Sequence, residues 1–185
     1  YVDGVPTVWE VKEEIVEFTY DVYESYVEIT GYSGNGGLVE IPSTIKGLPV
    51  TRIADSAFFL CESITGIAIP NTVEYIGVYA FFGCNLTSIE IPASVTQIGE
   101  YAFAENPSLA KISIPSAVTE ISETAFDQES LCIICEKDRY AEGYAKEKGY
   151  LTEGGQEATD LTLKKDSYEI AYGERQEIVV ELVPV

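Results

Sequence analysis

Apolar and polar positions in the middle of the chain repeat with a period of 22 or 23 residues. The period is set by two dipeptides, Ile-Pro and Ala-Phe, and each recurs four times along these repeats. Ile-Pro lies at Ile41-Pro42, Ile69-Pro70, Ile91-Pro92 and Ile114-Pro115, and Ala-Phe at Ala57-Phe58, Ala80-Phe81, Ala102-Phe103 and Ala125-Phe126. A repeat of this length cannot bury an apolar face alone, so the pattern predicts a solenoid of stacked coils.

The order of apolar positions within a repeat predicts two short extended segments and one compact turn. Ile112 and Ile114 are alternating inward positions of a short strand, and Pro115 ends it because proline lacks a backbone donor. The chain then returns through a second extended stretch to the Ala-Phe turn, where the small alanine allows a tight bend. We expect the phenylalanines to fill the interior between neighbouring coils: Phe58, Phe81, Phe103 and Phe126.

An open solenoid exposes its core at both ends, so both ends need caps. Residues 18–30 alternate apolar and polar side chains, which predicts a β-hairpin laid on the first coil. At the other end we expect a helix over about 138–149, with Asp138 as its N-cap and Gly149 as its stop. This helix is predicted to be an amphipathic lid, or alternatively a partner-binding helix, with four residues on one face: Tyr140, Ala141, Tyr144 and Ala145.

The repeat resembles the BspA-like leucine-rich repeat family, also called the treponemal type. The resemblance covers about residues 18–150, and the third repeat shows it in full: Ile91, Pro92, Val95, Ile98, Ala102, Phe103, Asn106, Leu109 and Ile112. It implies a right-handed leucine-rich repeat solenoid of the α/β superhelix class, mainly β with short turns or 3-10 segments, capped by a hairpin and a helix. It also implies a surface-exposed or secreted bacterial protein, often linked to adhesion, with no catalytic residues to carry over.

The resemblance also implies a structural role for the position three residues after the Ala-Phe phenylalanine. Leucine-rich repeats often have Asn or Cys there, pointing inward beneath the turn to satisfy backbone groups, and this chain has Cys61, Cys84 and Asn106. Stacking would bring Cys61 and Cys84 within disulfide range. Two buried free thiols are the alternative.

The sequence divides into four predicted segments. Residues 1–40 are the hairpin cap and its lead-in, 41–150 hold the repeats and the closing helix, and 151–159 read as a linker. Residues 160–185 resemble the opening strands of a bacterial Ig-like domain, on the basis of Leu161, Leu163, Ile170, Gly173 and Ile178. Because such a sandwich needs about 100 residues, we expect a truncated Ig-like domain, or a segment that pairs its strands elsewhere.

The composition narrows the classes of function. The chain has 11 basic and 31 acidic residues, for a net charge of −20, and this field repels nucleic-acid phosphates and anionic lipid. No apolar run approaches the roughly 20 residues of a membrane span, so we expect no direct membrane insertion. Solvated acidic faces are expected, with cation binding by clustered carboxylates as the alternative. The chain also lacks Met, so we expect a processed or excised piece of a longer protein.

Histidine is absent, which removes Ser-His-Asp and Cys-His catalysis and the commonest metal ligand. Cys132 and Cys135 form a Cys-x-x-Cys motif, but their stretch predicts a strand. Residues three apart on a strand point to opposite faces with Cα atoms about 10 Å apart, whereas a disulfide needs less than about 7 Å. We therefore predict no enzyme and no cofactor, with redox or metal chemistry at this motif as a minor alternative.

Two groups of side chains are candidates for the outer surface. The outward positions of the strand before each Ile-Pro are small or polar and offer no aromatic platform for sugars: Thr65, Gly66, Ala68, Thr87, Ser88, Glu90, Ala110, Lys111 and Ser113. Phe59 and Phe82 both follow Ala-Phe, while Tyr79 and Tyr101 both precede it. If exposed, these four would form an aromatic stripe that marks a contact site. Packing within the core or between coils is the alternative.

These features predict a non-catalytic module at the bacterial cell surface or secreted from the cell. We expect a monomer that binds an unknown extracellular protein or glycan, as in adhesion. One alternative is a structural spacer or stalk, which a smooth polar surface would favour. Another is an accessory targeting module of a secreted enzyme, which a catalytic domain in the flanking sequence would reveal.

Overall fold

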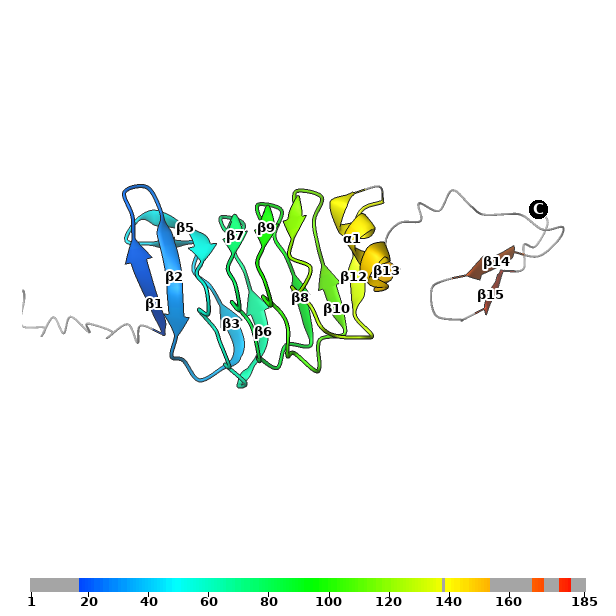
Figure 1. Cartoon of the computed structure of the whole chain (residues 1–185), viewed down its shortest axis with the longest axis horizontal. Helices are drawn as coiled ribbons and strands as arrows, with labels where there is room; N and C mark the ends of the chain where they lie inside the picture. The colour runs from blue at the N-terminus through cyan, green and yellow to red at the C-terminus, as the bar shows by residue number, and fades with distance from the viewer. Residues whose placement is uncertain (1–16, 138, 154–167, 172–176, 181–185) are drawn as a thin grey trace, which may run out of the picture.

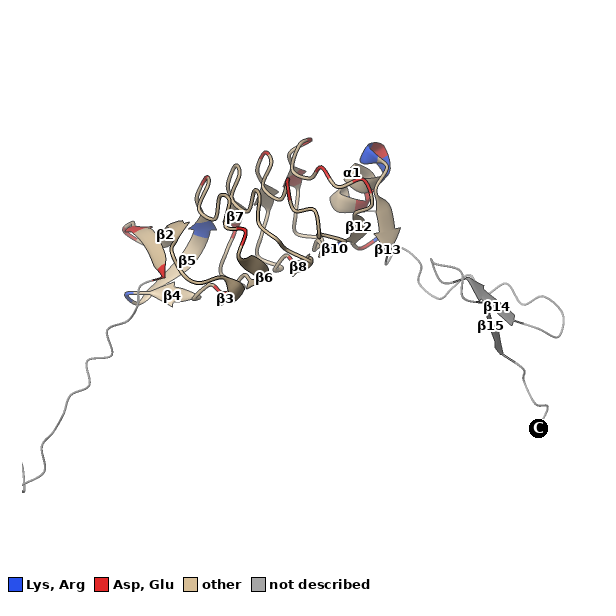
Figure 2. Cartoon of the chain, turned by 90° about the horizontal axis from the view of Figure 1, so that it is seen from below, with Lys and Arg blue, Asp and Glu red and all other residues tan. Residues whose placement is uncertain are grey.

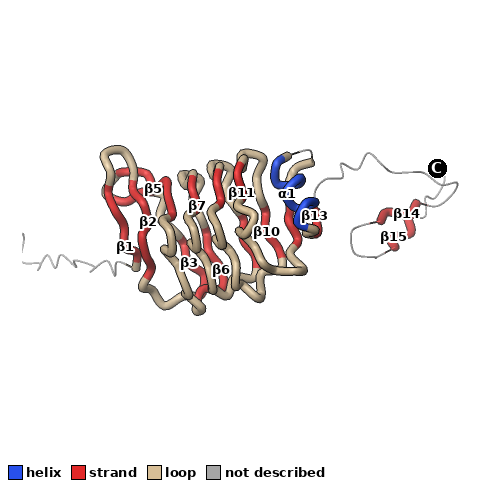
Figure 3. The backbone as a smooth tube through the Cα atoms, viewed as in Figure 1, coloured by secondary structure: helices blue, strands red, loops and turns tan. Residues whose placement is uncertain are grey.

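The computed structural model describes residues 17–137, 139–153, 168–171 and 177–180, and the first two of these ranges form a stack of β-coils with its caps (Figure 1). The strands lie on two faces of the stack, joined by turns (Figure 3). One face is a sheet in the order β1 (Phe18–Val22), β2 (Val27–Tyr32), β5 (Leu48–Ile53), β7 (Tyr75–Ile76), β9 (Gln97–Ile98) and β11 (Glu120–Ile121), with β4 (Thr44–Ile45) paired to β5. The other face holds β3 (Gly37–Glu40) paired with β6 (Ile64–Ala68), and a sheet of β8 (Ser88–Glu90), β10 (Lys111–Ser113), β12 (Cys132–Ile134) and β13 (Leu151–Glu153). The predicted solenoid is confirmed.

The Ile-Pro dipeptides mark the ends of the strands on the second face. Each of β3, β6, β8 and β10 ends one residue before its Ile-Pro pair. The coils add strands in parallel and in register, so that Ile89 pairs with Ile112 and Ile112 with Ile133. These three side chains are buried and stack in the interior. The connections between the strands from β1 to β12 are turns, bends and irregular segments, and helix α1 (Tyr140–Lys148) lies between β12 and β13.

The Ala-Phe phenylalanines form a continuous column through the core. Phe58, Phe81 and Phe103 are fully buried, and Phe126 is nearly so. Successive ring centroids are 4.9, 5.3 and 5.6 Å apart, and all three pairs are stacked. Stacked rings at this spacing exclude water from the interior between coils, as the 22- or 23-residue period predicts.

The coils approach so closely at one turn that only glycine fits. A Cβ atom on Gly99 would lie 2.8 Å from the backbone carbonyl carbon of Gly77 and the backbone nitrogen of Val78. These two glycines are equivalent positions, and Gly77 in turn lies against the backbone of Ala54. These backbone contacts therefore set the spacing of three coils on the side that carries the Ala-Phe turns.

The predicted N-terminal hairpin is present and covers the first coil. Strands β1 and β2 are antiparallel, and β2 continues into the parallel ladder by pairing with β5. The rings of Phe18 and Tyr32 lie against Phe58, with centroids 6.4 and 5.6 Å away. The hairpin thus shields the first end of the phenylalanine column.

Helix α1 (Tyr140–Lys148) closes the other end of the core. Tyr144 and Tyr150 place their rings against Phe126, and their hydroxyls donate to the backbone carbonyls of Ser122 and Phe126. Gly149 ends the helix in the left-handed conformation at φ 77°, as predicted. Helix α1 is therefore the predicted C-terminal cap.

Two details of the helix differ from the prediction. Asp138 lies outside the described residues, and Arg139 holds the N-cap position without a side-chain cap hydrogen bond. Tyr140 was predicted on the buried face but is 46% exposed, whereas Ala141, Tyr144 and Ala145 are buried. The buried stripe also includes Glu142, which pairs with Lys146 at 2.8 Å, and Tyr140 lies at the edge of this stripe, where its hydroxyl accepts from the Ile121 N–H at 3.5 Å.

Strand β13 shortens the predicted linker. Leu151–Glu153 pair with β12, so the solenoid extends through Glu153, and residues 154–159 lie outside the described part. In the predicted Ig-like segment, β14 (Tyr168–Ala171) and β15 (Glu177–Val180) form an antiparallel pair, and its remaining residues lie outside the described part. No helix among the described residues has the length and apolar character needed to span a membrane.

Candidate binding surface

The turn before each of the first three Ala-Phe pairs has an unusual backbone conformation. Ser56, Tyr79 and Tyr101 have φ angles of 60°, 56° and 52°, in the left-handed region. Each donates its N–H to a carbonyl of the next coil, at 2.8, 2.8 and 3.2 Å. Bulky residues are rare in this conformation, which costs on the order of 1–3 kcal/mol. The hydrogen bonds between coils hold two tyrosines in it.

The four predicted contact residues meet in one cluster on the outside of these turns, which we call the aromatic surface: Phe59, Tyr79, Phe82 and Tyr101. The rings form two stacked pairs, with centroids 5.3 Å apart for Phe59 and Phe82 and 5.0 Å apart for Tyr79 and Tyr101. Tyr79 joins the pairs edge to face, 5.3 Å from Phe82 and 6.1 Å from Phe59. Phe59 is 44% exposed and the other three are half-buried. The rings therefore stack between coils and remain partly open to solvent.

Leu60 extends this surface and was not singled out from the sequence. It is 53% exposed in a left-handed conformation at φ 55°, and the equivalent positions in the next two coils are Gly83 and Glu105. The sequence does contain a signal for this exposed position, because the next two coils have glycine and glutamate there and not an apolar residue. The surface ends where small side chains replace the aromatic ones, at Ala104 and Thr124.

A ladder of polar side chains supports the turns from inside. Asn106 is fully buried, and its amide donates to the carbonyls of Phe81, Phe103 and Ala104 at 2.8, 3.0 and 3.2 Å. Its Oδ1 accepts from the backbone N–H of Leu86 at 3.2 Å. Cys84 takes the equivalent place one coil earlier, where its Sγ donates to the Phe58 carbonyl at 3.3 Å. Cys61 is only half-buried at the edge of this ladder.

The fourth coil continues this ladder with a residue that sequence reasoning missed. Gln128 lies one position earlier than Asn106 does in its repeat, and its longer side chain reaches the Phe103 carbonyl with Nε2 at 3.0 Å. Its Oε1 is buried without a hydrogen-bond partner. The sequence does contain a signal for this role: a side-chain amide lies two residues after the Ala-Phe phenylalanine in the fourth repeat, where Asn106 lies three residues after it in the third.

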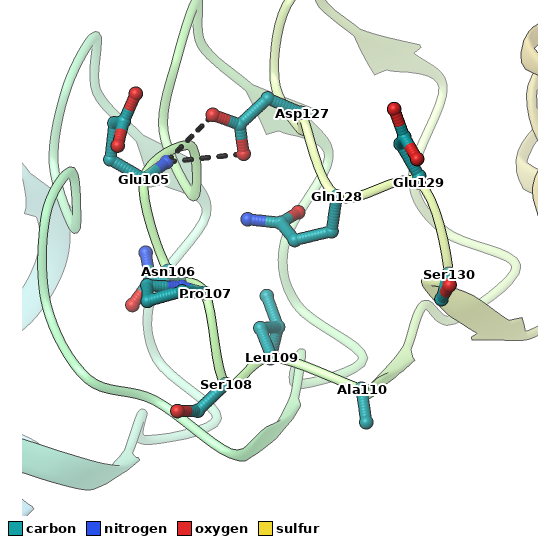
Figure 4. A pocket seen from close by; sticks show the side chains of 10 residues that line it. All are labelled: Glu105, Asn106, Pro107, Ser108, Leu109, Ala110, Asp127, Gln128, Glu129 and Ser130. Atoms are coloured by element: carbon teal, nitrogen blue, oxygen red, sulfur yellow. Dashed lines mark hydrogen bonds between the residues drawn. The ribbon is translucent and has the colours of Figure 1, made fainter.

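Two depressions lie beside the turns. The first, about 390 Å³, lies between the third and fourth coils and is lined by Glu105, Asn106, Pro107, Ser108, Leu109, Ala110, Asp127, Gln128, Glu129 and Ser130 (Figure 4). In it the Asp127 carboxylate accepts from the Glu105 N–H at 2.9 and 3.1 Å, so this carboxylate anchors a left-handed turn. The second, about 450 Å³, adjoins the aromatic surface and is lined by Leu60, Glu62, Phe82, Gly83, Cys84, Asn85, Glu105 and Pro107. We call this second one the Phe82 depression.

The coils that carry the aromatic surface are acidic. Residues 53–110 contain six acidic and no basic residues, and Figure 2 shows red but no blue positions on the coils between β5 and β10. The nearest basic side chain on the first sheet is Arg52, which pairs with Glu28 at 3.1 Å and lies over the Tyr75 ring. The aromatic surface thus lies in a negative field.

The four cysteines, all within the described residues, are free thiols. Burial raises the pKa of Cys84 to about 12, and the neighbouring Cys61 thiol also raises it. Burial also raises the pKa values of Cys61 and Cys135. Raised values keep these thiols protonated and therefore poor as nucleophiles or metal ligands at neutral pH. In the described part of the chain, no three Asp, Glu or Cys side chains gather as a metal site would require.

We expect thiol reagents to separate the buried cysteines from the others. In the native protein near pH 8, Cys84 and Cys135 should resist maleimide because each is buried and protonated, and all four should react in denaturant. Mass spectrometry of peptides after timed labelling measures this. Native labelling of Cys84 as fast as that of the partly exposed Cys132 would contradict the packing described here.

The sequence and fold place the chain among known proteins. A model of the BspA type leucine-rich repeat region matches residues 39–137 in six copies. The chain therefore belongs to this family. A leucine-rich repeat protein of T. pallidum is 30% identical, over 65% of this chain and 69% of that one, with a TM-score of 0.52. One from Bacteroides capillosus, at 24% identity over 76% of this chain and 97% of that one, has the same fold with a TM-score of 0.60. No curated protein matches.

Proposed function

We propose that the chain is a non-catalytic recognition module of a bacterial surface or secreted protein, and that the aromatic surface is its contact site. The observation that carries this proposal is that aromatic side chains from three successive coils join into one partly exposed cluster. Exposed aromatic residues are enriched at protein interfaces and dominate their energetics. The ligand class is an extracellular protein or glycan.

Two further features support recognition. The rings are held by stacking and by the hydrogen-bonded left-handed turns, so little conformational freedom is lost when a ligand binds. The perturbed thiols are shifted toward the protonated form, which argues against nucleophilic chemistry. The repeat family is a non-catalytic kind of fold, which agrees with this.

A spacer role is the second candidate, and one observation favours it. The outward positions of β6, β8 and β10 are small or polar. Exposed leucines occur only on the two outermost strands of that face, Leu38 on β3 and Leu151 on β13, among the described residues. This face offers a partner little apolar area. Because the aromatic surface lies on the turns instead, we favour recognition.

The test is binding to an array of extracellular-matrix proteins and glycans at physiological salt. The double variant Tyr79→Ser, Phe82→Ala places in the second coil the residues found at the equivalent positions Ser56 and Ala104, so it should fold. We expect saturable binding by the native chain and a loss of about tenfold or more in the variant, since aromatic anchors contribute more than about 1 kcal/mol each.

Leu38→Ser serves as the matched control, because it removes an exposed apolar side chain from another face. Thermal unfolding of all three proteins checks that the fold is intact. Equal binding by the native chain and the double variant would refute this contact site. No detectable binding to any component of the array would favour the spacer role.

A further inference from the structure

We propose that the partner is a basic polypeptide segment, with Lys or Arg side chains that enter the Phe82 depression while neighbouring apolar residues lie on the aromatic surface. This inference rests on the proposed recognition function and names the chemistry of its ligand. Charge is distributed unevenly along the chain. Between Arg52 and Lys111 the chain has no basic residue, and its acidic residues there are Asp55, Glu62, Glu74, Glu90, Glu100 and Glu105.

The lining of the Phe82 depression suits a long cationic side chain. Phe82 and Leu60 supply apolar surface for the methylene groups, while Glu62 and Glu105 are exposed carboxylates in the same lining. A guanidinium or ammonium group attracted by the ring of Phe82, on the second coil, would have one carboxylate on either side, Glu62 on the first coil and Glu105 on the third. The Phe82 depression, at about 450 Å³, has room for such a side chain.

The molecule already contains an arrangement of this kind. The guanidinium carbon of Arg52 lies 4.1 Å from the centroid of the Tyr75 ring, and its Nε donates to Glu28 Oε1 at 3.1 Å. Here an arginine from within the chain satisfies both an aromatic face and a carboxylate. At the Phe82 depression, the aromatic ring and the carboxylates come from the chain, and the cation is left for a partner to supply.

The negative electrostatic field of the chain favours a basic polypeptide over other classes of ligand. With a net charge of −20, the chain repels nucleic acid and anionic lipid and raises the rate of encounter with cationic partners. A neutral glycan could stack on the rings and donate hydroxyl hydrogen bonds to the carboxylates, but it would gain no attraction between opposite charges. A polypeptide with alternating basic and apolar residues uses both features at once.

The experiment measures binding of the native chain to a short fluorescent peptide of alternating arginine and leucine, by anisotropy at several ionic strengths. A peptide of alternating serine and leucine is the neutral control. The variant Glu62→Gln, Glu105→Gln removes both carboxylates of the depression at nearly constant shape. The matched control, Glu40→Gln, Glu120→Gln, makes the same change in net charge at exposed sites on β3 and β11.

We expect the arginine peptide to bind, the serine peptide to bind much more weakly, and Glu62→Gln, Glu105→Gln to weaken binding about tenfold. Glu40→Gln, Glu120→Gln should stay close to the native chain. Equal weakening by both double variants would show diffuse attraction to net charge and overturn the inference. If the arginine peptide fails to bind while Tyr79→Ser, Phe82→Ala abolishes binding to a neutral array component, this inference fails and the recognition function stands. Failure of both experiments overturns both.

Discussion

Replacing Phe81 with alanine should destabilise the solenoid by about 3–5 kcal/mol. Phe81 is fully buried and stacks on Phe58 at 4.9 Å and on Phe103 at 5.3 Å, so alanine would leave a cavity that rigid neighbouring coils cannot close. Each coil contacts only its neighbours, so the loss would separate the stack into two weakly coupled halves. Chemical denaturation followed by circular dichroism measures the effect.

Phe82→Ala is the control for this prediction. The two phenylalanines are adjacent in sequence, but Phe82 is half-buried on the aromatic surface, and the equivalent residue in the next coil is already alanine. We expect its cost to be a small fraction of that of Phe81→Ala. Similar losses for the two variants would mean that the stacked column is not the main support of the core.

Asn106→Leu should destabilise the protein by about 3 kcal/mol or more. The substitution keeps the branched shape of the side chain but leaves the carbonyl of Phe81 and the N–H of Leu86 without their side-chain partner in the interior, whereas the Phe103 carbonyl keeps its hydrogen bond from Gln128. Each buried polar group left unpaired costs about 1–3 kcal/mol. The free energy of unfolding from denaturant titration tests this.

Asn106→Cys is the comparison that isolates the hydrogen bonds. Cys84 occupies the equivalent position and donates from Sγ to the Phe58 carbonyl, so cysteine can replace part of the network. We expect a loss between zero and that of leucine. A leucine variant as stable as the native protein would show that these hydrogen bonds contribute no net stability.

The repeat made the core predictable from sequence. Positions such as Phe81, Phe103 and Ile112 recur at a fixed spacing, and any stacking of coils in register must bring them together. The caps were also predictable, because hydrophobic alternation marks the hairpin and Gly149 marks the end of the helix. Local patterns of this kind do not depend on the details of packing.

Other features depend on packing that the pattern does not contain. The left-handed conformation of Tyr79 and Tyr101 is imposed by hydrogen bonds between coils, whereas tyrosine itself disfavours it. The repeat spacing shows that Phe59 is equivalent to Phe82 and Tyr79 to Tyr101, but it does not indicate whether these side chains are buried. Helix α1 buries Glu142 and leaves Tyr140 partly exposed, a choice that helical periodicity alone does not indicate.

Mapping where a bound ligand contacts the chain tests whether the aromatic surface is the contact site. The array component with the highest affinity would be titrated into the isotopically labelled chain, and chemical-shift changes would be recorded for the backbone and aromatic side chains. We expect the largest changes at Phe59, Tyr79, Phe82 and Tyr101, with small changes on the face formed by β6, β8 and β10. Changes centred on that strand face, with the aromatic resonances unmoved, would contradict this expectation.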